Sequence, residues 1–446
     1  MNYSDIYDKY NIIDKFSDFP KRLSGNKLIA KFIELFQPEV LREYDAVGNL
    51  RFLPGLEEGE YILNTNLADD VRLAIAEMEE EITQMYHLPS SMRLFSLGRL
   101  ADRVKFCSTR YKVDYYPLQA VKDVTWTNAC GNRFCVNCQS TMAGQRFSKY
   151  APLLDDLSEY YDLYHVVLTI PNPRPEELFD DVEQMYKAFK YLIRYLSGIK
   201  TVTGLNFEKY GYKGCIRSLE ITKNWEEGTF HPHFHCIFVF KKDSKLTWNQ
   251  KYINKFSFSN PDVKKSHHKG ADNIRHFSEF EILLQKVWAI LFDGEVLTAK
   301  AVAERKLGYS CIADLCRKGK YHEVFKYSMK GVFKAPDKDD FDFERSYKDF
   351  KVLFVTLFKR RVCQGYGCFH GFKLDELDLS VDPEEEYNKA KEFLRQLEIP
   401  IKQNITLDDI LNDFKQKNIT YISRGNIVGL IMEKMEDTSD ERDREA

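Results

Sequence analysis

The chain has 446 residues, which is enough for two or three domains with complete hydrophobic cores. Its 43% hydrophobic and 30% charged residues are typical of a soluble globular protein, and no apolar stretch is long enough to span a membrane. The N-terminal sequence is too polar for a secretory signal, so we expect a cytoplasmic protein. The net charge of −3 does not indicate nucleic-acid binding, but the distribution of charge matters more than its sum.

The first hundred residues are predicted to be largely helical. Residues 27–36 and 67–86 have apolar side chains at helical spacing, and Pro38 and the PGLEEGEY run separate them. We therefore expect a helical N-terminal extension over residues 1–100. It either contacts DNA or mediates oligomerisation, or it is simply a structural domain.

Four cysteines follow this extension. Cys130, Cys135 and Cys138 lie in ACGNRFCVNC, and Cys107 lies upstream. This spacing is typical of a four-thiolate structural zinc site, which would make residues 101–150 a zinc module. The alternative is a set of reduced, buried thiols. A disulfide framework does not fit a large chain without a secretory signal. The other cysteines are expected to be small core residues: Cys215, Cys236, Cys311, Cys316, Cys363 and Cys368.

The central part of the chain alternates strand and helix patterns. HVVLTIPNP, residues 165–173, is a strand-like apolar run closed by a proline turn. Residues 176–198 have helical spacing and are expected to pack behind a sheet. CIRSLEITKN (215–224) and HPHFHCIFVF (231–240) read as two strands, and NWEEG between them reads as a turn. The pair predicts an antiparallel hairpin.

Two histidines in this hairpin share one face. His233 and His235 are separated by one residue, and strand side chains alternate with a period of two. Folding about the turn brings Glu220 level with them, although sequence alone does not fix the register. Two imidazoles and a carboxylate suit a divalent cation such as Mg²⁺ or Mn²⁺. By the same alternation, His231 lies on the face of His233 and His235, and it is a weaker ligand candidate. The alternative is a set of ordinary histidines and a solvated glutamate.

A helical pattern over residues 321–331 carries a second group of reactive side chains. Glu323 and Tyr327 lie four residues apart on one face, and so do Lys326 and Lys330. A tyrosine can act as a covalent nucleophile, a glutamate as a general base, and lysines can hold phosphates. Taken alone, a helical tyrosine in a chain with 26 tyrosines is usually a packing residue.

The remaining segments are less specific. Residues 241–270 are rich in lysine with aromatic side chains between, which suits contact with single-stranded DNA but also a solvated loop. Residues 371–446 are expected to form a helical C-terminal region, with helical spacing over 382–435. The last residues, 433–446, are mostly acidic and are expected to be disordered.

Together, three of these segments resemble the motifs of HUH endonucleases in their order. The match is closer to the rolling-circle plasmid replication initiators of the Rep_1 family. The segments are LTIPN (168–172), LEITKN…HPHFH (219–235) and EVFKY (323–327). The family also has a similar cysteine element before its first motif. In addition, FKRRVCQGYGCF (358–369) loosely resembles a segment that follows the third motif in the family. The resemblance covers residues 100–370. The stretch 242–310 looks long for the family, and the N-terminal hundred residues have no counterpart.

The resemblance implies an α+β fold. An antiparallel-sheet HUH nuclease domain would span residues 160–370, preceded by the zinc module and flanked by helical regions. It also implies that His233, His235 and Glu220 hold the divalent ion, and that Tyr327 attacks the scissile phosphate of single-stranded origin DNA. The tyrosine would keep the 5′-phosphate, and the freed 3′-hydroxyl would prime a host polymerase, with a host helicase as a further possible partner. Glu323 would direct water or a hydroxyl at termination.

Two other functions remain open at this point. A transposase or relaxase would use the same chemistry on a different DNA, and a zinc-containing nucleic-acid-binding protein would carry no catalysis. A single tyrosine with a glutamate one helical turn before it favours replication. The origin sequence, the metal used in the cell and the oligomeric state are not contained in these patterns.

Overall fold

The computed structural model describes residues 19–46, 97–242, 254–257, 274–306, 311–316, 318, 321–325, 341–358, 360–370, 383–416 and 419–423. The chain divides into two compact units. The first comprises Met1–Ser148, Phe333–Lys359 and Leu379–Thr438, and the second comprises Lys149–Val332, Arg360–Asp378 and Ser439–Ala446. Within the described ranges, no helix has the length and apolar character needed to cross a membrane.

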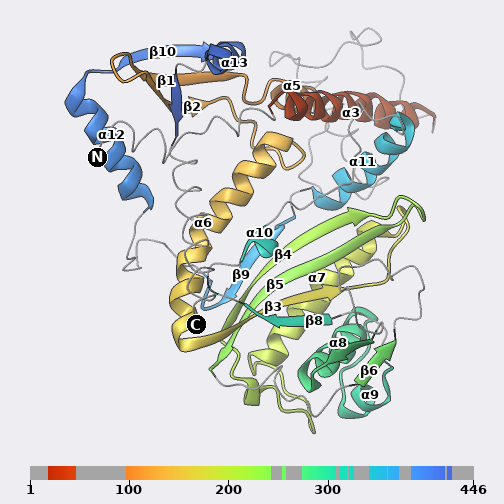
Figure 1. Ribbon diagram of the computed structural model, residues 1–446. Helices are drawn as coiled ribbons and strands as arrows, with labels where there is room; N and C mark the ends of the chain where they lie inside the picture. The colour runs from red at the N-terminus through yellow and green to blue at the C-terminus, as the bar shows by residue number, and fades with distance from the viewer. Residues whose placement is uncertain are drawn as a thin grey trace, which may run out of the picture. The chain divides into compact units, whose positions relative to one another are not determined.

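The first unit contains a four-stranded sheet in the order β10-β1-β2-β11 (Figure 1). Its strands are β1 (Arg110–Tyr116), β2 (Val121–Thr127), β10 (Ile401–Thr406) and β11 (Thr420–Ile422). β1 is antiparallel to both β2 and β10, whereas β11 is parallel to β2. The C-terminal strands therefore complete a sheet that begins just after the predicted N-terminal extension.

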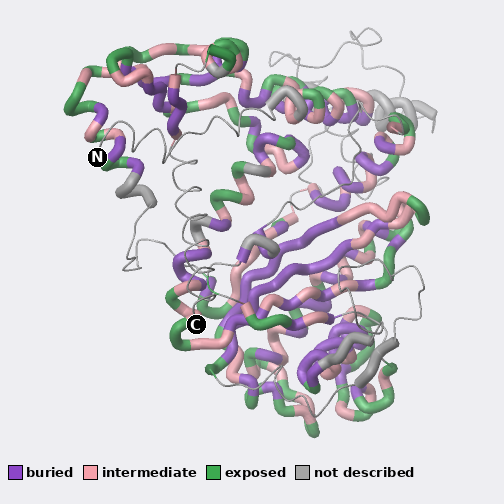
Figure 2. The backbone as a smooth tube through the Cα atoms, in the orientation of Figure 1, coloured by how far each residue is buried: buried purple, intermediate pink, exposed green. Residues whose placement is uncertain are grey.

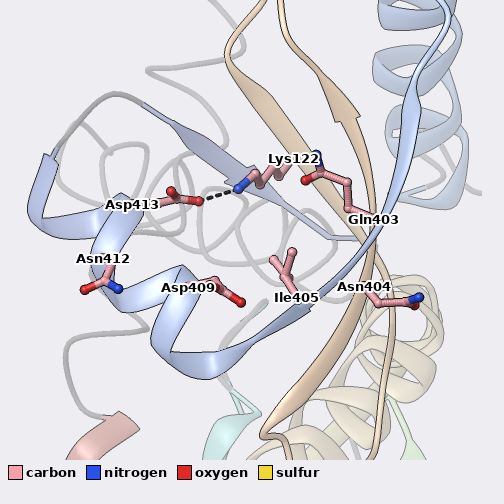
Figure 3. A pocket seen from close by; sticks show the side chains of 7 residues that line it. All are labelled: Lys122, Gln403, Asn404, Ile405, Asp409, Asn412 and Asp413. Carbon is pink, nitrogen blue, oxygen red and sulfur yellow. Dashed lines mark hydrogen bonds and ion pairs between the residues drawn. The ribbon is translucent and has the colours of Figure 1, made fainter.

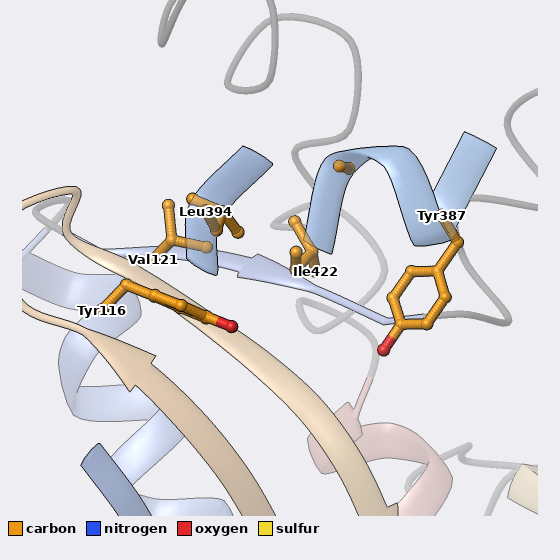
Figure 4. Close-up of a cluster of buried hydrophobic side chains, with 6 residues drawn as sticks. Tyr116, Val121, Tyr387, Leu394 and Ile422 are labelled. Atoms are coloured by element: carbon orange, nitrogen blue, oxygen red, sulfur yellow. The ribbon is translucent and has the colours of Figure 1, made fainter. Parts of the chain in front are cut away.

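Two helices pack on opposite faces of this sheet. α12 (Pro383–Leu397) covers one face, and the cluster in Figure 4 comprises Tyr116, Val121, Tyr387, Ala390, Leu394 and Ile422. α13 (Leu407–Gln416) covers the other face, with a cluster of Tyr111, Val113, Leu407, Ile410 and Tyr421. This division follows from the alternation of strand side chains, because Tyr116 and Val113 have opposite parity on β1.

A buried ionic group fixes α12 on its face. Asp114 and Asp123 lie directly opposite each other on β1 and β2, and Asp123 is fully buried. Two carboxylates in this position repel unless a cation lies between them. The Lys391 Nζ lies 2.8 Å from Asp123 Oδ2 and 3.7 Å from Asp114 Oδ2, and the Tyr387 hydroxyl donates to Asp123 at 2.9 Å. One lysine and one tyrosine of α12 thus satisfy the pair.

Three helices complete the described part of the first unit: α3 (Phe19–Ala46), α5 (Leu97–Lys105) and α11 (Phe343–Leu357). Phe32 of α3 lies 5.4 Å from Phe350 of α11, measured between ring centroids. The same aromatic cluster includes Phe134, which stacks on Phe354 at 5.3 Å. α6 (Val136–Tyr160) begins here, and the Asn26 side chain accepts from the Val136 N–H at 2.8 Å. The boundary between the two units falls within α6.

The second unit contains a five-stranded antiparallel sheet in the order β8-β3-β5-β4-β9. Its strands are β3 (Tyr161–Thr169), β4 (Gly214–Lys223), β5 (Phe230–Lys241), β8 (Cys311–Leu315) and β9 (Cys363–Gly367). The central strands β4 and β5 are buried over most of their length (Figure 2). A separate pair, β6 (Asn254–Ser257) and β7 (Ile274–Phe277), forms a short two-stranded ribbon.

Helices α7 (Leu178–Leu196) and α8 (Glu279–Phe292) cover one face of this sheet. Phe234 of β5 lies 5.4 Å from Phe189 of α7 and 6.1 Å from Trp288 of α8. Since Phe234 lies between His233 and His235, the histidines project to the opposite face. The shorter helical segments are η2 (Glu208–Tyr210), α9 (Ala299–Glu304) and α10 (His322–Phe325). Figure 1 shows α7 behind the sheet and α10 in front of it.

A fully buried arginine lies on the α7 side of β4. The Arg217 guanidinium lies 4.2 Å from the Tyr186 ring and 4.8 Å from the Phe234 ring. Its Nη2 donates to the Arg361 carbonyl at 2.9 Å, and the Tyr186 hydroxyl donates to the same oxygen at 3.0 Å. Arg217 therefore connects the segment before β9 to the central hairpin. It does so by stacking on aromatic rings and by donating to the Arg361 carbonyl, which also accepts from Tyr186.

The predicted α+β class with antiparallel sheets is confirmed. The predicted strands and the helix over residues 176–198 correspond to β3, β4, β5 and α7. Residues 383–423 differ from a purely helical region, because β10 and β11 join the sheet of the first unit. The four-domain division stays a prediction. The predicted helix over 67–86, most of residues 241–270 and the acidic tail lie outside the described residues.

Candidate active site and cysteine cluster

The hairpin of β4 and β5 fixes the register of the candidate site. Asn224 begins the turn, and its carbonyl accepts from Gly228 while its N–H donates to Thr229, both at 2.9 Å. Gly228 has a φ of 75°, which a residue without Cβ adopts at little cost. With this turn, Glu220 lies directly opposite His233. Sequence alone did not decide which face of the hairpin Glu220 occupies. In the structure, its side chain shares one face with those of His233 and His235.

Glu220, His233 and His235 converge on one point. The Glu220 Oε2 lies 2.8 Å from His235 Nε2 and 3.3 Å from His233 Nε2, and the two imidazole nitrogens are 3.1 Å apart. All three residues are less than 10% exposed. Together they form a group whose nitrogen and oxygen atoms could hold one metal ion.

The outer nitrogens of both imidazoles have partners. His233 Nδ1 donates to the His231 carbonyl at 3.1 Å, because a carbonyl can only accept. With Nδ1 donating, Nε2 of His233 is the nitrogen that faces Glu220, and once deprotonated it could bind a cation. His235 Nδ1 lies 3.0 Å from Nε2 of His165 on β3. When His165 accepts from that nitrogen, Nε2 of His235 is likewise the nitrogen that faces Glu220.

Electrostatics keep the carboxylate charged and the flanking histidine neutral. Burial alone would raise the pKa of Glu220, but hydrogen bonds from His233 and His235 outweigh it and hold the pKa well below its ordinary value. Burial and the charge of His233 lower the pKa of His231 to about 4. A divalent cation requires an anionic oxygen and deprotonated imidazole nitrogens, so its binding would replace the protons that lie between Glu220 and the two histidines.

The LTIPN segment supports the start of β5. The Asn172 Oδ1 accepts from His231 Nδ1 at 2.7 Å, and the Pro173 carbonyl accepts from the Phe230 N–H at 2.9 Å. Trp288 donates to the Thr169 carbonyl at 2.7 Å, which fixes the end of β3 against α8. The first motif thus holds His231 rather than contributing a side chain to the group of three.

The third motif is described only at its beginning. α10 lies against β4 and β5, and Phe325 stacks on Tyr150 of α6 with ring centroids 5.7 Å apart. The Tyr321 hydroxyl donates to Asp155 at 2.8 Å. The helix is therefore anchored beside the strands that carry the histidines. The Glu323 side chain and residues Lys326, Tyr327 and Lys330 lie outside the described part of the chain.

The four predicted cysteines come together in the first unit. The sulfurs of Cys107, Cys130, Cys135 and Cys138 all lie within 4.8 Å of one another, and all four residues are buried. Cys138 Sγ lies 3.5 Å from Cys107 Sγ and 3.6 Å from Cys130 Sγ. Tetrahedral bonds of 2.3 Å to zinc would place the sulfurs about 3.8 Å apart. All ten cysteines of the chain are free thiols.

Backbone N–H groups point at these sulfurs. Cys130 N donates to Cys107 Sγ at 3.3 Å, and Gly131 N donates to Cys138 Sγ at the same distance. Asn132 N donates to Cys130 Sγ at 3.4 Å. Such donors stabilise thiolates more than thiols, because the charged form accepts more strongly. The loop therefore has the geometry of a metal-binding cluster.

The remaining cysteines agree partly with the expected core role. Cys215, Cys236 and Cys311 are buried, and burial raises the pKa of the Cys215 thiol well above its ordinary value. Cys316 and Cys363 are half-buried, whereas Cys368 is exposed. None of the six belongs to a described metal-ligating group.

Known proteins are similar to the part of the chain that carries this site. Residues 121–260 match the model of the Rep_1 family, which is described as a replication protein. The matched range includes LTIPN, Glu220, His233 and His235, and it ends before the EVFKY segment. The resemblance predicted from the motifs is therefore confirmed for residues 121–260, which are similar to the Rep_1 replication proteins.

Several curated relatives are each named Protein rep. The Bacillus amyloliquefaciens protein is 28% identical over 152 residues, which cover 33% of this chain and 41% of that protein. The Staphylococcus aureus protein is 30% identical over 133 residues, covering 28% and 52%. The Bacillus sp protein is 36% identical over 78 residues, covering 18% and 22%. The chain thus spans about half or less of the length of these relatives. No solved structure matches it.

Proposed function

We propose that this protein initiates rolling-circle replication of a plasmid or similar element by nicking and rejoining single-stranded origin DNA. The observation that carries the proposal is the convergence of Glu220, His233 and His235 on one face of the β4–β5 hairpin. The Rep_1 domain match and the relatives named Protein rep support the link to replication. The nuclease would be of the HUH type, with a tyrosine as nucleophile.

The three side chains fit a hard divalent cation such as Mg²⁺ or Mn²⁺. Bonds of 2.0–2.1 Å at right angles place neighbouring octahedral ligands about 2.9 Å apart. The observed separations of 2.8, 3.1 and 3.3 Å are close to this value. Such a cation, when bound, polarises a phosphate oxygen and offsets charge in the transition state. The four sulfurs of the cysteine cluster fit Zn²⁺ in a closed structural site.

The proposed reaction is a transesterification at one phosphodiester. Tyr327 Oη forms a bond to phosphorus, the bond from phosphorus to the 3′-oxygen breaks, and the proton lost by the tyrosine balances the one gained by the 3′-hydroxyl. The 5′-phosphate stays on the protein, and the 3′-hydroxyl is free to prime a polymerase. Lys326 and Lys330 would hold neighbouring phosphates. At termination Glu323 would accept a proton from water or a hydroxyl.

Adduct formation tests the proposal. Wild-type protein incubated with labelled single-stranded DNA containing an origin hairpin and Mn²⁺ should yield a covalent complex on a denaturing gel. Tyr327→Phe removes only the hydroxyl, so the fold should survive and the adduct should disappear. Chelation should have the same effect on wild type.

Two outcomes would count against this function. An undiminished adduct with Tyr327→Phe would move the nucleophile elsewhere, with Tyr321 as the first alternative. DNA binding without any cleavage in Mg²⁺ or Mn²⁺ would favour a non-catalytic zinc-containing DNA-binding protein. A transposase or relaxase would instead cleave the ends of a mobile element or a transfer origin in preference to the replication origin.

His165 is expected to tune the metal affinity through His235. Its Nε2 lies 3.0 Å from His235 Nδ1, which is the position of an outer partner that orients a ligating imidazole. His165→Ala should weaken Mn²⁺ binding by about 10- to 100-fold. His165→Gln retains an acceptor and should recover part of this loss. Calorimetric titration with Mn²⁺ checks the result, and equal affinity in wild type and His165→Ala would remove His165 from the site.

A further inference from the structure

The first unit has a half-covered sheet face. α12 packs over Tyr116 and Val121, at the end of β1 and β2 where the two strands are joined. At the other end of the same face, Lys112 of β1 lies directly opposite Trp126 of β2 and Asn404 of β10. These three residues are exposed. The open half of the face therefore carries side chains that no described helix covers.

A β-bulge turns Trp126 to this face. Val113 pairs with Val124 but Lys112 pairs with Trp126, so Thr125 is an extra residue in β2. Without the extra residue, Trp126 would project to the face that α13 covers. The Thr125 hydroxyl donates to the Lys112 carbonyl at 3.1 Å and holds the bulge. As a result, a tryptophan remains 49% exposed beneath the Lys112 ammonium, which lies 5.5 Å from its ring.

A second exposed pair of the same kind lies in the loop that is hydrogen-bonded to the end of β2. Phe106 is 54% exposed, and the Lys105 Nζ lies 5.6 Å from its ring. Asn128, two residues after Trp126, donates to the Phe106 carbonyl at 2.6 Å and accepts from Arg110 N at 2.9 Å. The end of β2 is thereby bound to the loop that carries Phe106.

The cations of this region have no acidic partner at ion-pair distance within the described ranges. Lys105, Arg110, Lys112 and Lys402 form no ion pair with any residue that the structure describes. Two other lysines of this sheet region, Lys122 and Lys391, do have acidic partners. Lys122, on the α13 side, contacts Asp413 at 2.5 Å, and Figure 3 shows this ion pair in the pocket lined by α13 and β10. In the same view, Gln403 projects toward Lys122 and Asn404 projects away from it.

We propose that the Trp126 surface (Lys105, Phe106, Arg110, Lys112, Trp126 and Lys402) binds single-stranded DNA through base stacking and phosphate contacts. Exposed aromatic rings accept any unpaired base, and unneutralised cations follow the backbone. Duplex DNA keeps its bases stacked internally, so the aromatic rings favour a single strand. The proposal rests on the proposed function and adds to it a DNA contact separate from the hairpin of Glu220, His233 and His235.

Binding of a fluorescein-labelled oligo-dT 15-mer to the full-length protein tests this surface. The titration is followed by anisotropy in EDTA, so that cleavage does not interfere. Trp126→Ala should weaken binding about tenfold, because stacking on one ring is lost. Trp126→Phe keeps a stacking surface and should bind within about twofold of wild type. Lys112→Ala should lower the slope of log affinity against log salt by about 0.7.

The second unit offers a matched control. Tyr191 of α7 is 41% exposed, with the Lys200 Nζ 4.7 Å from its ring, so it is a similar surface pair outside the Trp126 surface. Tyr191→Ala should leave oligo-dT binding unchanged. Equal affinities of Trp126→Ala, Tyr191→Ala and wild type would overturn the proposal. So would unchanged DNA binding in Trp126→Ala together with a lower sedimentation coefficient, which would make this a protein interface.

The two proposals fail in different ways. Trp126-dependent binding without any tyrosine adduct would exclude the proposed nuclease function and support the proposed DNA-binding surface. A normal adduct in Trp126→Ala with unaltered oligo-dT affinity would exclude the DNA-binding surface and support the nuclease function. If Trp126→Ala does not fold, as judged by circular dichroism, Lys112→Ala and Trp126→Phe still decide the question.

Discussion

Replacing His233 and His235 together with alanine is expected to slow metal-dependent cleavage by at least about a thousandfold. A bound cation contributes several kcal/mol to transition-state stabilisation, and each 1.36 kcal/mol corresponds to about tenfold in rate. Glu220 alone is too weak a site to retain the cation. Binding to single-stranded DNA should persist, since it depends on surface cations rather than on these buried imidazoles. Single-turnover cleavage and anisotropy on the same oligonucleotide measure both quantities.

The double alanine variant also leaves a carboxylate without partners. Glu220 is 7% exposed, and an unpaired buried charge costs about 3–5 kcal/mol of folding free energy. His233→Gln/His235→Gln keeps hydrogen-bond partners for Glu220 and controls for this effect. Wild type should be stabilised by about 2.7 kcal/mol at a Mn²⁺ concentration 100 times Kd, and the glutamine variant should not. Equal Mn²⁺-dependent cleavage and stabilisation in wild type and the glutamine variant would exclude the site.

The hairpin could be predicted because its signals are local. Alternation places His233 and His235 on one face, and Asn224 and Gly228 mark the turn. Sequence could not decide whether Glu220 shares that face, since a slip of one residue reverses every side chain. The hydrogen bonds of the turn fix the register and place Glu220 opposite His233.

Long-range partners explain what sequence missed. His165 meets His235 only because β3 pairs with β5, and a lone histidine in an apolar strand gives no signal of this. Arg217 has the charge of a surface residue, yet aromatic rings from α7 and β5 surround it. β10, with the sequence IKQNIT, is short and polar, so its place in the sheet depends on pairing with β1. The role of Tyr327 stays a prediction from the motif.

The cysteine cluster is expected to have the largest effect on stability. It joins three elements of the first unit: Cys107 follows α5, Cys130 follows β2, and Cys138 lies in the first turns of α6. Phe134, next to Cys135, stacks on Phe354 of α11 and extends this connection into the aromatic cluster. Loss of one thiolate should therefore release the start of α6 and the loop that carries Phe106 together.

Cys135→Ser should abolish binding of about one equivalent of zinc and the cooperative unfolding of the first unit. Zinc binding contributes roughly 10–16 kcal/mol in zinc-finger peptides, whereas a whole domain is stable by about 5–15 kcal/mol. Elemental analysis and calorimetry measure the two effects. Cys368→Ser, at an exposed cysteine of the second unit, is the matched control and should retain both zinc and melting behaviour. Full zinc content and an unchanged Tm in Cys135→Ser would show that these thiols only fill the core.

If the cluster is a zinc site, oligo-dT binding should also fall in Cys135→Ser, because Phe106 and Lys105 immediately precede Cys107.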